Sequence, residues 1–387
     1  MISMQKKRLE TVILGPLLTL KKGKKPKSQS SVKEKGMQPY VDIKAFETGV
    51  VDNYTNDDKC VPCNDGDLLI VCDGSRSGYV GRAIKGYTGS TLAKISAEGV
   101  DNSYLYYFIQ SMYRLLNTQM KGTGTPHLNA EVLKKAELVI PSLDEQKRVV
   151  NRIEELFSEL DGAVETLKKT KEQLVVYRQS VLKDAFSRFS SKEIILNHSE
   201  LVTSGSRGWA QYYSEQGARF IRITDLTRDR IVLKNDDVQY VALPNNVEGK
   251  RSRLMANDIL VSITADLGSV ALVPEDIEEA YINQHIALVR LKNPDVAKFI
   301  ALYLKSDWGQ KDLLRNKRGG GKLGLGLDDI RNTPIPIVSN DIACKVVSQI
   351  ESRLTVCDNI EKTVNDALAQ AEAMRQSILK KAFEGGL

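Results

Sequence analysis

A seven-residue hydrophobic repeat runs through the middle of the chain. Residues 144–188 contain no proline and one glycine, and aliphatic side chains recur at every seventh position. This row consists of Ile153, Leu160, Leu167, Leu174 and Val181. If these residues occupy position a of a heptad, Leu156, Ala163 and Tyr177 form the second row, at position d. The pattern predicts one long helix whose seam packs against another helix.

The same pattern returns near the C-terminus. The tripeptide Arg178-Gln179-Ser180 reappears as Arg375-Gln376-Ser377, 197 positions later. The second row at position a consists of Ile350, Cys357, Val364, Ala371 and Ile378, and its d positions include Ile360, Ala367 and Met374. We predict that the two helices pair and bury their seams against each other, because an exposed seam five heptads long promotes aggregation. The alternative is two independent amphipathic helices, each lying on its own domain.

A glycine-containing, strand-like segment precedes each helix. Residues 66–71 of the first segment match 257–262 of the second, and 39–43 match 219–223. A repeat of this size indicates two whole domains rather than a solenoid. We therefore predict a mixed α/β (α+β) chain with pseudo-twofold repetition and two long antiparallel helices. The expected order is a globule at 1–142, a helix at 143–189, a globule at 190–338 and a helix at 339–387.

Composition places the chain among soluble globular proteins. It has 387 residues, 42% of them hydrophobic, which is enough for two cores. Apolar runs stay far below the roughly 18 residues that a membrane span needs, and no export signal is visible, so we expect the cytoplasm. Cys60 and Cys63 have CxxC spacing and Cys72 follows, but a fourth zinc ligand is missing nearby. We interpret them as thiols and expect no metal.

Motifs that carry chemistry are missing from the sequence. A methyltransferase acting on adenine needs a glycine-rich cofactor loop and an Asn/Asp-Pro-Pro-aromatic site, and neither is present. Gly319-Gly320-Gly321-Lys322 lacks the spacing and hydroxyl of a phosphate loop. The three histidines are His127, His198 and His285, and the alternating pattern around His285 favours a structural role. We predict no catalytic residue.

Basic loops rich in glycine favour nucleic acid as the partner. The chain carries a net charge of +6 and has a pI near 8.8. Clustered cations attract phosphates, and long side chains reach base edges. Candidates in the first globule are Lys22, Lys24, Lys25, Arg76, Arg82, Lys121, Thr123 and Thr125. Candidates in the second are Arg207, Trp209, Arg222, Arg228, Arg315, Lys317, Arg318 and Lys322. For any single cation the alternative is ordinary surface charge.

These segments together resemble the specificity subunits of type I restriction-modification systems. The resemblance spans nearly the whole chain and rests on the proline-acidic-glutamine turn at 141–148, the two Arg-Gln-Ser endings, and residues 217–226, 257–263 and 281–291. Departures also exist. The first globule has 86–91 in place of the Asn-Gln-His segment, and Gly326 stands where the first copy has Asn129.

The resemblance implies a function and a set of partners. It implies two target-recognition domains that bind double-stranded DNA at two unlike half-sites, with an unread gap held at fixed length by the helices. It also implies two methyltransferase subunits, which bring S-adenosylmethionine, and motor-nuclease restriction subunits, which use ATP and Mg²⁺. The chain itself would need no cofactor and no membrane. The alternatives are a stand-alone site-specific endonuclease or methyltransferase, and an orphan DNA-binding regulator.

Overall fold

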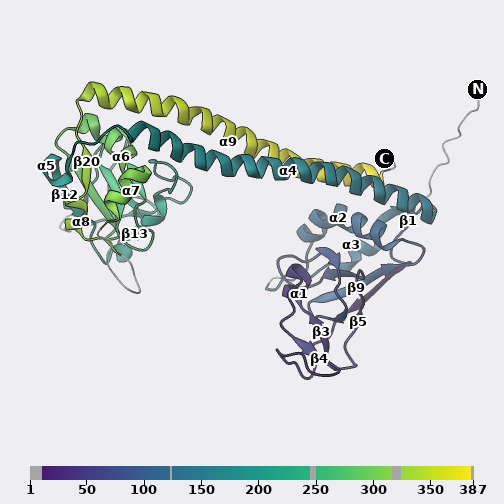
Figure 1. Ribbon diagram of the computed structural model, residues 1–387. Coiled ribbons are helices and arrows are strands. Elements are labelled where there is room, and N and C mark those ends of the chain that lie inside the picture. The colour runs from purple at the N-terminus through teal and green to yellow at the C-terminus, as the bar shows by residue number, and fades with distance from the viewer. Residues whose placement is uncertain (1–10, 123, 245–249, 316–323, 385–387) are drawn as a thin grey trace, which may run out of the picture. The chain divides into compact units, whose positions relative to one another are not determined.

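The computed structural model describes residues 11–122, 124–244, 250–315 and 324–384 (Figure 1). The chain divides into two compact units, Met1–Thr166 with Ala367–Leu387, and Leu167–Asp366. Each unit contains one globule and part of each of two long helices, α4 (Leu143–Phe186) and α9 (Asn340–Phe383). In the part of the chain that is described, no helix combines the length and apolarity that crossing a membrane requires.

The first globule is built on two four-stranded sheets. The main sheet has the strand order β2-β9-β6-β7 with antiparallel neighbours, formed by Leu18–Lys22, Leu92–Ala97, Leu68–Val71 and Val80–Arg82. The second has the order β4-β3-β8-β5, formed by Tyr54–Thr55, Gln38–Val41, Gly86–Thr88 and Pro62–Cys63. The remaining elements are β1 (Thr11–Ile13), which pairs with β10 (Glu137–Val139), and the helices α1 (Ile43–Thr48), α2 (Asn102–Thr118) and α3 (Ala130–Lys134).

The second globule repeats this plan. Its main sheet has the order β12-β19-β16-β17, formed by Ser199–Ser204, Ile286–Leu291, Ile259–Ser262 and Val270–Leu272. Its second sheet has the order β13-β15-β14-β18, formed by Tyr213–Ser214, Tyr240–Val241, Ala218–Ile221 and Ala280–Ile282. The remaining strands and α-helices are β11 (Lys192–Ile194), β20 (Pro334–Pro336), α5 (Ile195–His198), α6 (Ala297–Lys305), α7 (Asp307–Leu313) and α8 (Leu327–Arg331).

Repeated backbone hydrogen bonds align the two globules residue by residue. Cys72 N donates to Thr91 O over 2.8 Å, and Ile263 N donates to His285 O over 2.9 Å. Leu128 N donates to Cys72 O, and Leu325 N donates to Ile263 O. The same contacts recur although most side chains differ. The two globules are therefore copies of one mixed α/β fold.

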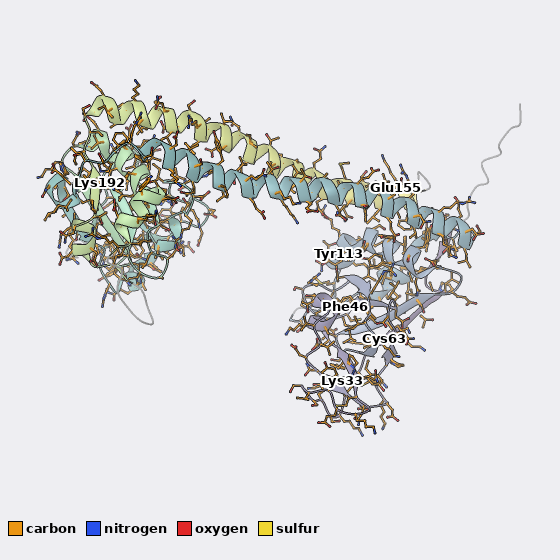
Figure 2. The ribbon with its side chains drawn as sticks, viewed as in Figure 1. Lys33, Phe46, Cys63, Tyr113, Glu155 and Lys192 are labelled. Carbon is orange, nitrogen blue, oxygen red and sulfur yellow. The ribbon has the colours of Figure 1, made fainter. Side chains whose placement is uncertain are left out.

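Each main sheet is buried on both faces. In β6, Leu68 and Ile70 face a core shared with α2 and the long helices, whereas Leu69 and Val71 face the second sheet, because successive strand residues point to opposite sides. Cys63 joins the second of these cores, in the globule that Figure 2 shows with Phe46 and Cys63 labelled. Burial raises the pKa of the Cys72 thiol to about 11. Cys60, Cys63 and Cys72 are all buried thiols.

The long helices are anchored by aromatic residues at their C-terminal ends. Phe186 of α4 packs edge-on against Phe299 and Tyr303 of α6, with ring centroids 5.2 and 5.4 Å apart. Phe383 of α9 packs in the same way against Tyr104 of α2, with centroids 5.1 Å apart. The C-terminal end of each long helix therefore joins the core of one globule.

The two long helices pair in antiparallel order. In the second unit, Lys171 contacts Asn365 and Arg178 contacts Asp358, so that later positions on α4 meet earlier positions on α9. In the first unit, Arg375 forms an ion pair with Asp161 and lies over the ring of Phe157. Independent amphipathic helices, the alternative arrangement, are not what the structure contains.

The seam uses one predicted row and a different second row. Ile153, Leu160, Leu174, Val181, Ile350, Val364 and Ala371 are buried, and Leu167 and Ile378 are half-buried. The d row is wrong at Tyr177, Ile360 and Met374, which are 48%, 40% and 48% exposed, whereas Leu156 and Ala367 are half-buried. The second row instead lies four residues after the first and includes Phe157, Arg178, Leu354 and Ala382. Its charged members hid it from a search for apolar residues.

Candidate nucleic-acid interface

Three candidate cations of the first globule lie near the end of β2. Lys22 ends the strand, and its Nζ lies 2.9 Å from a carboxylate oxygen of Asp73. Lys24 and Lys25 follow as exposed residues. Lys121 is also exposed and forms a backbone bridge with His127, whose Nδ1 lies 2.7 Å from Asp73. The fold therefore places Lys22 and Lys121 at the same edge of the main sheet, although they are about a hundred positions apart in sequence.

Two of the other candidates of the first globule already contact side chains of the same chain. Arg76 pairs with Glu47 at 2.6 Å and lies over the Tyr79 ring. Arg82 donates to the Ser103 hydroxyl over 2.8 Å. Thr125 is exposed, and Thr123 lies outside the described residues. Arg76 and Arg82 would have to exchange these contacts to bind DNA.

In the second globule the candidates occupy different environments. Arg207 and Arg315 are exposed. Arg222 pairs with Asp225 and with Asp237, and Arg228 pairs with Asp266. Lys317, Arg318 and Lys322 lie outside the described residues.

Trp209 is a core residue. It is 5% exposed, it stacks on Phe220 with a centroid distance of 5.5 Å, and it meets Tyr281 edge-on. A base cannot stack on a face that is already covered. The predicted role of Trp209 at the DNA surface is therefore replaced by a structural one.

Two histidines that were not predicted to bind DNA lie beside the ends of buried strands. His127 contacts the Asp73 carboxylate. Burial raises the pKa of Asp73, but hydrogen bonds from His127 and Lys22 outweigh this effect and hold that pKa below its ordinary value. His285 Nδ1 lies 2.6 Å from the Thr264 hydroxyl. The sequence could have indicated these sites by position, because Asp73 and Thr264, the partners of the two histidines, each come two residues after a buried strand.

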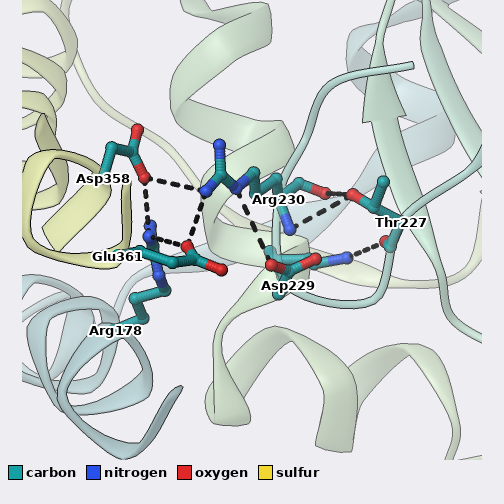
Figure 3. Close-up of polar contacts among 7 residues, drawn as sticks. Arg178, Thr227, Asp229, Arg230, Asp358 and Glu361 are labelled. Atoms are coloured by element: carbon teal, nitrogen blue, oxygen red, sulfur yellow. Dashed lines mark hydrogen bonds and ion pairs between the residues drawn. The ribbon is translucent and has the colours of Figure 1, made fainter. Parts of the chain in front are cut away.

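An ion network joins the second globule to the helix pair (Figure 3). Arg178, whose side chain is 6% exposed, lies 2.6 Å from Asp358 and 2.9 Å from Glu361. Arg230, from the loop after Thr227, reaches the same two carboxylates at 3.2 and 2.8 Å. Two guanidinium groups therefore share two carboxylates, one group coming from α4 and the other from the globule.

A buried lysine supports the loop that carries Arg230. The Lys305 ammonium, on α6, donates to the Thr227 carbonyl. Lys305 is 4% exposed, and burial lowers its pKa to about 8 although Asp229 opposes the shift. The loop at 227–230 is thus held from the globule side by Lys305 and from the helix side by Glu361.

The repeated fold and paired helices agree with comparisons to known proteins. The family model for the type I restriction modification DNA specificity domain matches residues 6–174 and 220–370. The chain belongs to this family. A relative, the type I restriction enzyme EcoBI specificity subunit of Escherichia coli, is 24% identical over 356 residues, which is 83% of this chain and 73% of that protein. The MjaVIII specificity subunit of Methanocaldococcus jannaschii is 23% identical over 403 residues, 97% of this chain and 92% of that one.

Solved structures show the same fold for the specificity family. A chain from a study of complex assembly and conformational transition of the type I R-M system has a TM-score of 0.71 at 16% identity and 98% coverage of both chains. The HsdS subunit from Thermoanaerobacter tengcongensis has a TM-score of 0.51 at 16% identity, covering 98% of this chain and 97% of that one. The predicted resemblance and fold class are confirmed. The predicted domain boundaries and the DNA role of the cations stay predictions.

Proposed function

We propose that this specificity subunit directs a type I restriction-modification complex to a bipartite, asymmetric DNA target. The observation that carries the proposal is one fold built twice with unlike residues at equivalent positions, such as Asp73 and Thr264. Each globule reads one half-site in double-stranded DNA. Because the two reading surfaces differ, the two half-sites differ as well.

The long helices hold the two globules at a fixed separation and bind the partner subunits. A helix of 44 residues measures about 66 Å at about 1.5 Å per residue, whereas DNA turns once in about 34 Å. An unread gap of fixed length then lies between the half-sites. Exposed apolar residues on α4, namely Val175, Val176 and Tyr177 at 53%, 70% and 48% exposure, provide a surface for a partner.

The partners supply the chemistry. Two methyltransferase subunits dock on the helices and bring S-adenosylmethionine, and motor-nuclease subunits that use ATP and Mg²⁺ join in the full complex. The chain itself binds DNA and catalyses nothing. A pseudo-twofold scaffold suits the binding of two copies of one partner.

The docking role is tested by co-expressing the chain with a type I methyltransferase subunit from the same host. We expect the two to co-purify and to methylate DNA together, while the chain alone transfers no methyl group and cuts no DNA. Val176→Asp on α4 weakens co-purification by roughly tenfold, since it places a charge in an apolar contact. Val50→Asp is the matched control, because Val50 is 52% exposed but lies in the first globule.

Two outcomes would contradict the proposal. Methyl transfer or cleavage by the chain alone would indicate a stand-alone enzyme. Site-specific DNA binding without any methyltransferase partner would indicate an orphan regulator.

A further inference from the structure

Equivalent strand ends in the two globules form the same backbone edge. β2 ends at Lys22 and β12 at Ser204, and each is followed by a glycine that another strand approaches closely. A Cβ on Gly23 would lie 2.3 Å from the Thr88 carbonyl oxygen, and a Cβ on Gly205 would lie 1.9 Å from that of Ile282. Only glycine fits at such a distance. The edge is thus a repeated structural feature.

Asp73 and Thr264 occupy the same position on this edge. Asp73 forms an isolated backbone bridge with His127, and Thr264 forms the equivalent bridge with Gly324. Each side chain also contacts a histidine ring nitrogen, that of His127 or of His285. The two histidines come from different segments, because His127 precedes α3 whereas His285 precedes β19.

In the first globule the edge presents a lysine ammonium and an imidazole ring. The Asp73 carboxylate accepts from Lys22 and contacts His127 Nδ1 at 2.7 Å, so its negative charge is neutralised locally. The side chains of Lys22 and His127 are 53% and 54% exposed. They can therefore reach a ligand while Asp73, with 19% exposure, holds them.

In the second globule the edge presents an amide. Gln284 Nε2 lies 2.9 Å from His285 Nε2, and His285 Nδ1 lies 2.6 Å from the Thr264 hydroxyl. The His285 ring thus links Gln284 to the sheet edge. The backbone N–H of His285 also donates to Asn283 Oδ1 over 3.1 Å. Gln284, His285 and Thr264 are all half-buried, which fixes their orientation without removing them from the surface.

We propose that these two edges are the base-reading sites of the two globules. This inference rests on the proposed function, and it names the residues that give each half-site its sequence. Lys22 and His127 read base edges for the first globule, and Asp73 positions them. Gln284 reads a base edge for the second globule, and His285 and Thr264 position it.

The chemistry of the two sets predicts different bases. The Lys22 ammonium is a donor and suits guanine, whose major-groove edge offers the O6 and N7 acceptors. A glutamine amide offers one donor and one acceptor and suits adenine, which presents N6–H₂ and N7. Neighbouring exposed cations such as Lys24 and Arg207 contact phosphates and set the register without reading sequence.

The test is binding of the complex to DNA libraries randomised one position at a time in each half-site. His127→Ala should relax preference at one position of a single half-site by roughly tenfold to a hundredfold, the range expected for a lost base contact. Gln284→Ala should do the same in the other half-site. Gln284→Glu should shift the preferred base toward cytosine, because a carboxylate accepts from the cytosine N4 amino group.

Controls separate base reading from folding and from phosphate contact. His198→Ala removes a histidine outside both edges, which contacts Glu193 instead, and should leave both half-sites unchanged. Lys24→Ala should weaken binding to all sequences alike and reduce the salt dependence, whereas His127→Ala and Gln284→Ala should keep the salt slope. Thermal unfolding of each variant checks the fold.

Three results would overturn the inference. The first is a uniform loss of affinity in His127→Ala and Gln284→Ala. The second is relaxed preference in both half-sites by one variant, and the third is unchanged preference in both folded variants. Each result would contradict the assignment of these residues while leaving a bipartite target intact. A wild-type complex with no bipartite target would instead remove the proposed function, and this inference with it.

Discussion

Arg178 of α4 and Asp358 of α9 form an ion pair at 2.6 Å that recurs with the helices exchanged. In the recurrence, Arg375 of α9 pairs with Asp161 of α4, and both residues lie 197 positions from their counterparts. Each helix therefore contributes one arginine and one aspartate. Because ion pairs inside a helix seam fix the register of the partners, we assign these two pairs to holding the antiparallel alignment.

Replacing Arg178 with methionine should destabilise the second unit. The substitution leaves Asp358 and Glu361 facing each other with only Arg230 to balance their charges. We expect the free energy of unfolding to fall by about 2 kcal/mol. This is less than the full cost of breaking a buried ion pair, because the two carboxylates are partly exposed. Urea denaturation measures the change.

The control for Arg178 is Arg148→Met. Arg148 pairs with Glu145 on the same helix, but its side chain is 76% exposed, so the loss should stay within about 0.5 kcal/mol. Equal effects of the two substitutions would contradict a structural role for the buried pair.

Truncating the aromatic anchors should act on one globule each. Phe186→Ala removes contacts with α6, and Phe383→Ala removes contacts with α2, so each should cost about 3 kcal/mol. Hydrogen exchange followed by mass spectrometry should show faster exchange in α6 for Phe186→Ala and in α2 for Phe383→Ala. Val176→Ala, at a position 70% exposed, should change neither. Equal acceleration in both globules would refute this anchoring.

The sequence predicted the duplication and the helices better than it predicted surfaces. The spacing of Ile153 and Leu160 identified a true seam row, because buried positions in a long helix must be apolar on one side. The second row was missed since Arg178 sits in it as a buried charge, and only the partner carboxylates make that burial favourable.

Surface roles depend on tertiary contacts that composition does not contain. Trp209 was predicted to lie at the DNA surface, but Phe220 and Tyr281 cover its ring. Asp73 and His127 are likewise brought together by sheet pairing across 54 positions. No local pattern announces such a pair.

Lys305 should make stability depend on pH in the alkaline range. Its pKa falls from 10.5 to about 8 on folding, so the unfolded state binds more protons between these values. The cost of burying the ammonium is present below pH 8 and is relieved as pH rises toward 10.5. The stability of the wild type relative to Lys305→Met should therefore rise by up to about 3 kcal/mol across this window.

Urea unfolding at several pH values measures this difference for Lys305. Lys298→Met is the matched control, because Lys298 lies on the same helix with a side chain 44% exposed, and it should show no comparable rise. A difference that falls with increasing pH would reverse the sign and contradict the buried environment of Lys305.

Shortening both long helices by one heptad should change the gap in the DNA target and nothing else. Removing residues 164–170 together with 366–372, which lie between the contacts Lys171–Asn365 and Asp161–Arg375, keeps the seven-residue repeat of each helix and shortens each by about 10 Å. The two half-sites should keep their sequences while the number of unread bases between them falls. An unchanged gap with altered half-sites would show that the helices do not set the spacing.

Base-resolution mapping of methylated DNA in the host, with and without this gene, tests whether the two globules recognise two unlike half-sites. We expect one interrupted motif to disappear on deletion, with two unlike half-sites separated by a gap of constant length. Motifs that are palindromic or uninterrupted, or a methylation pattern that does not depend on the gene, would contradict this expectation.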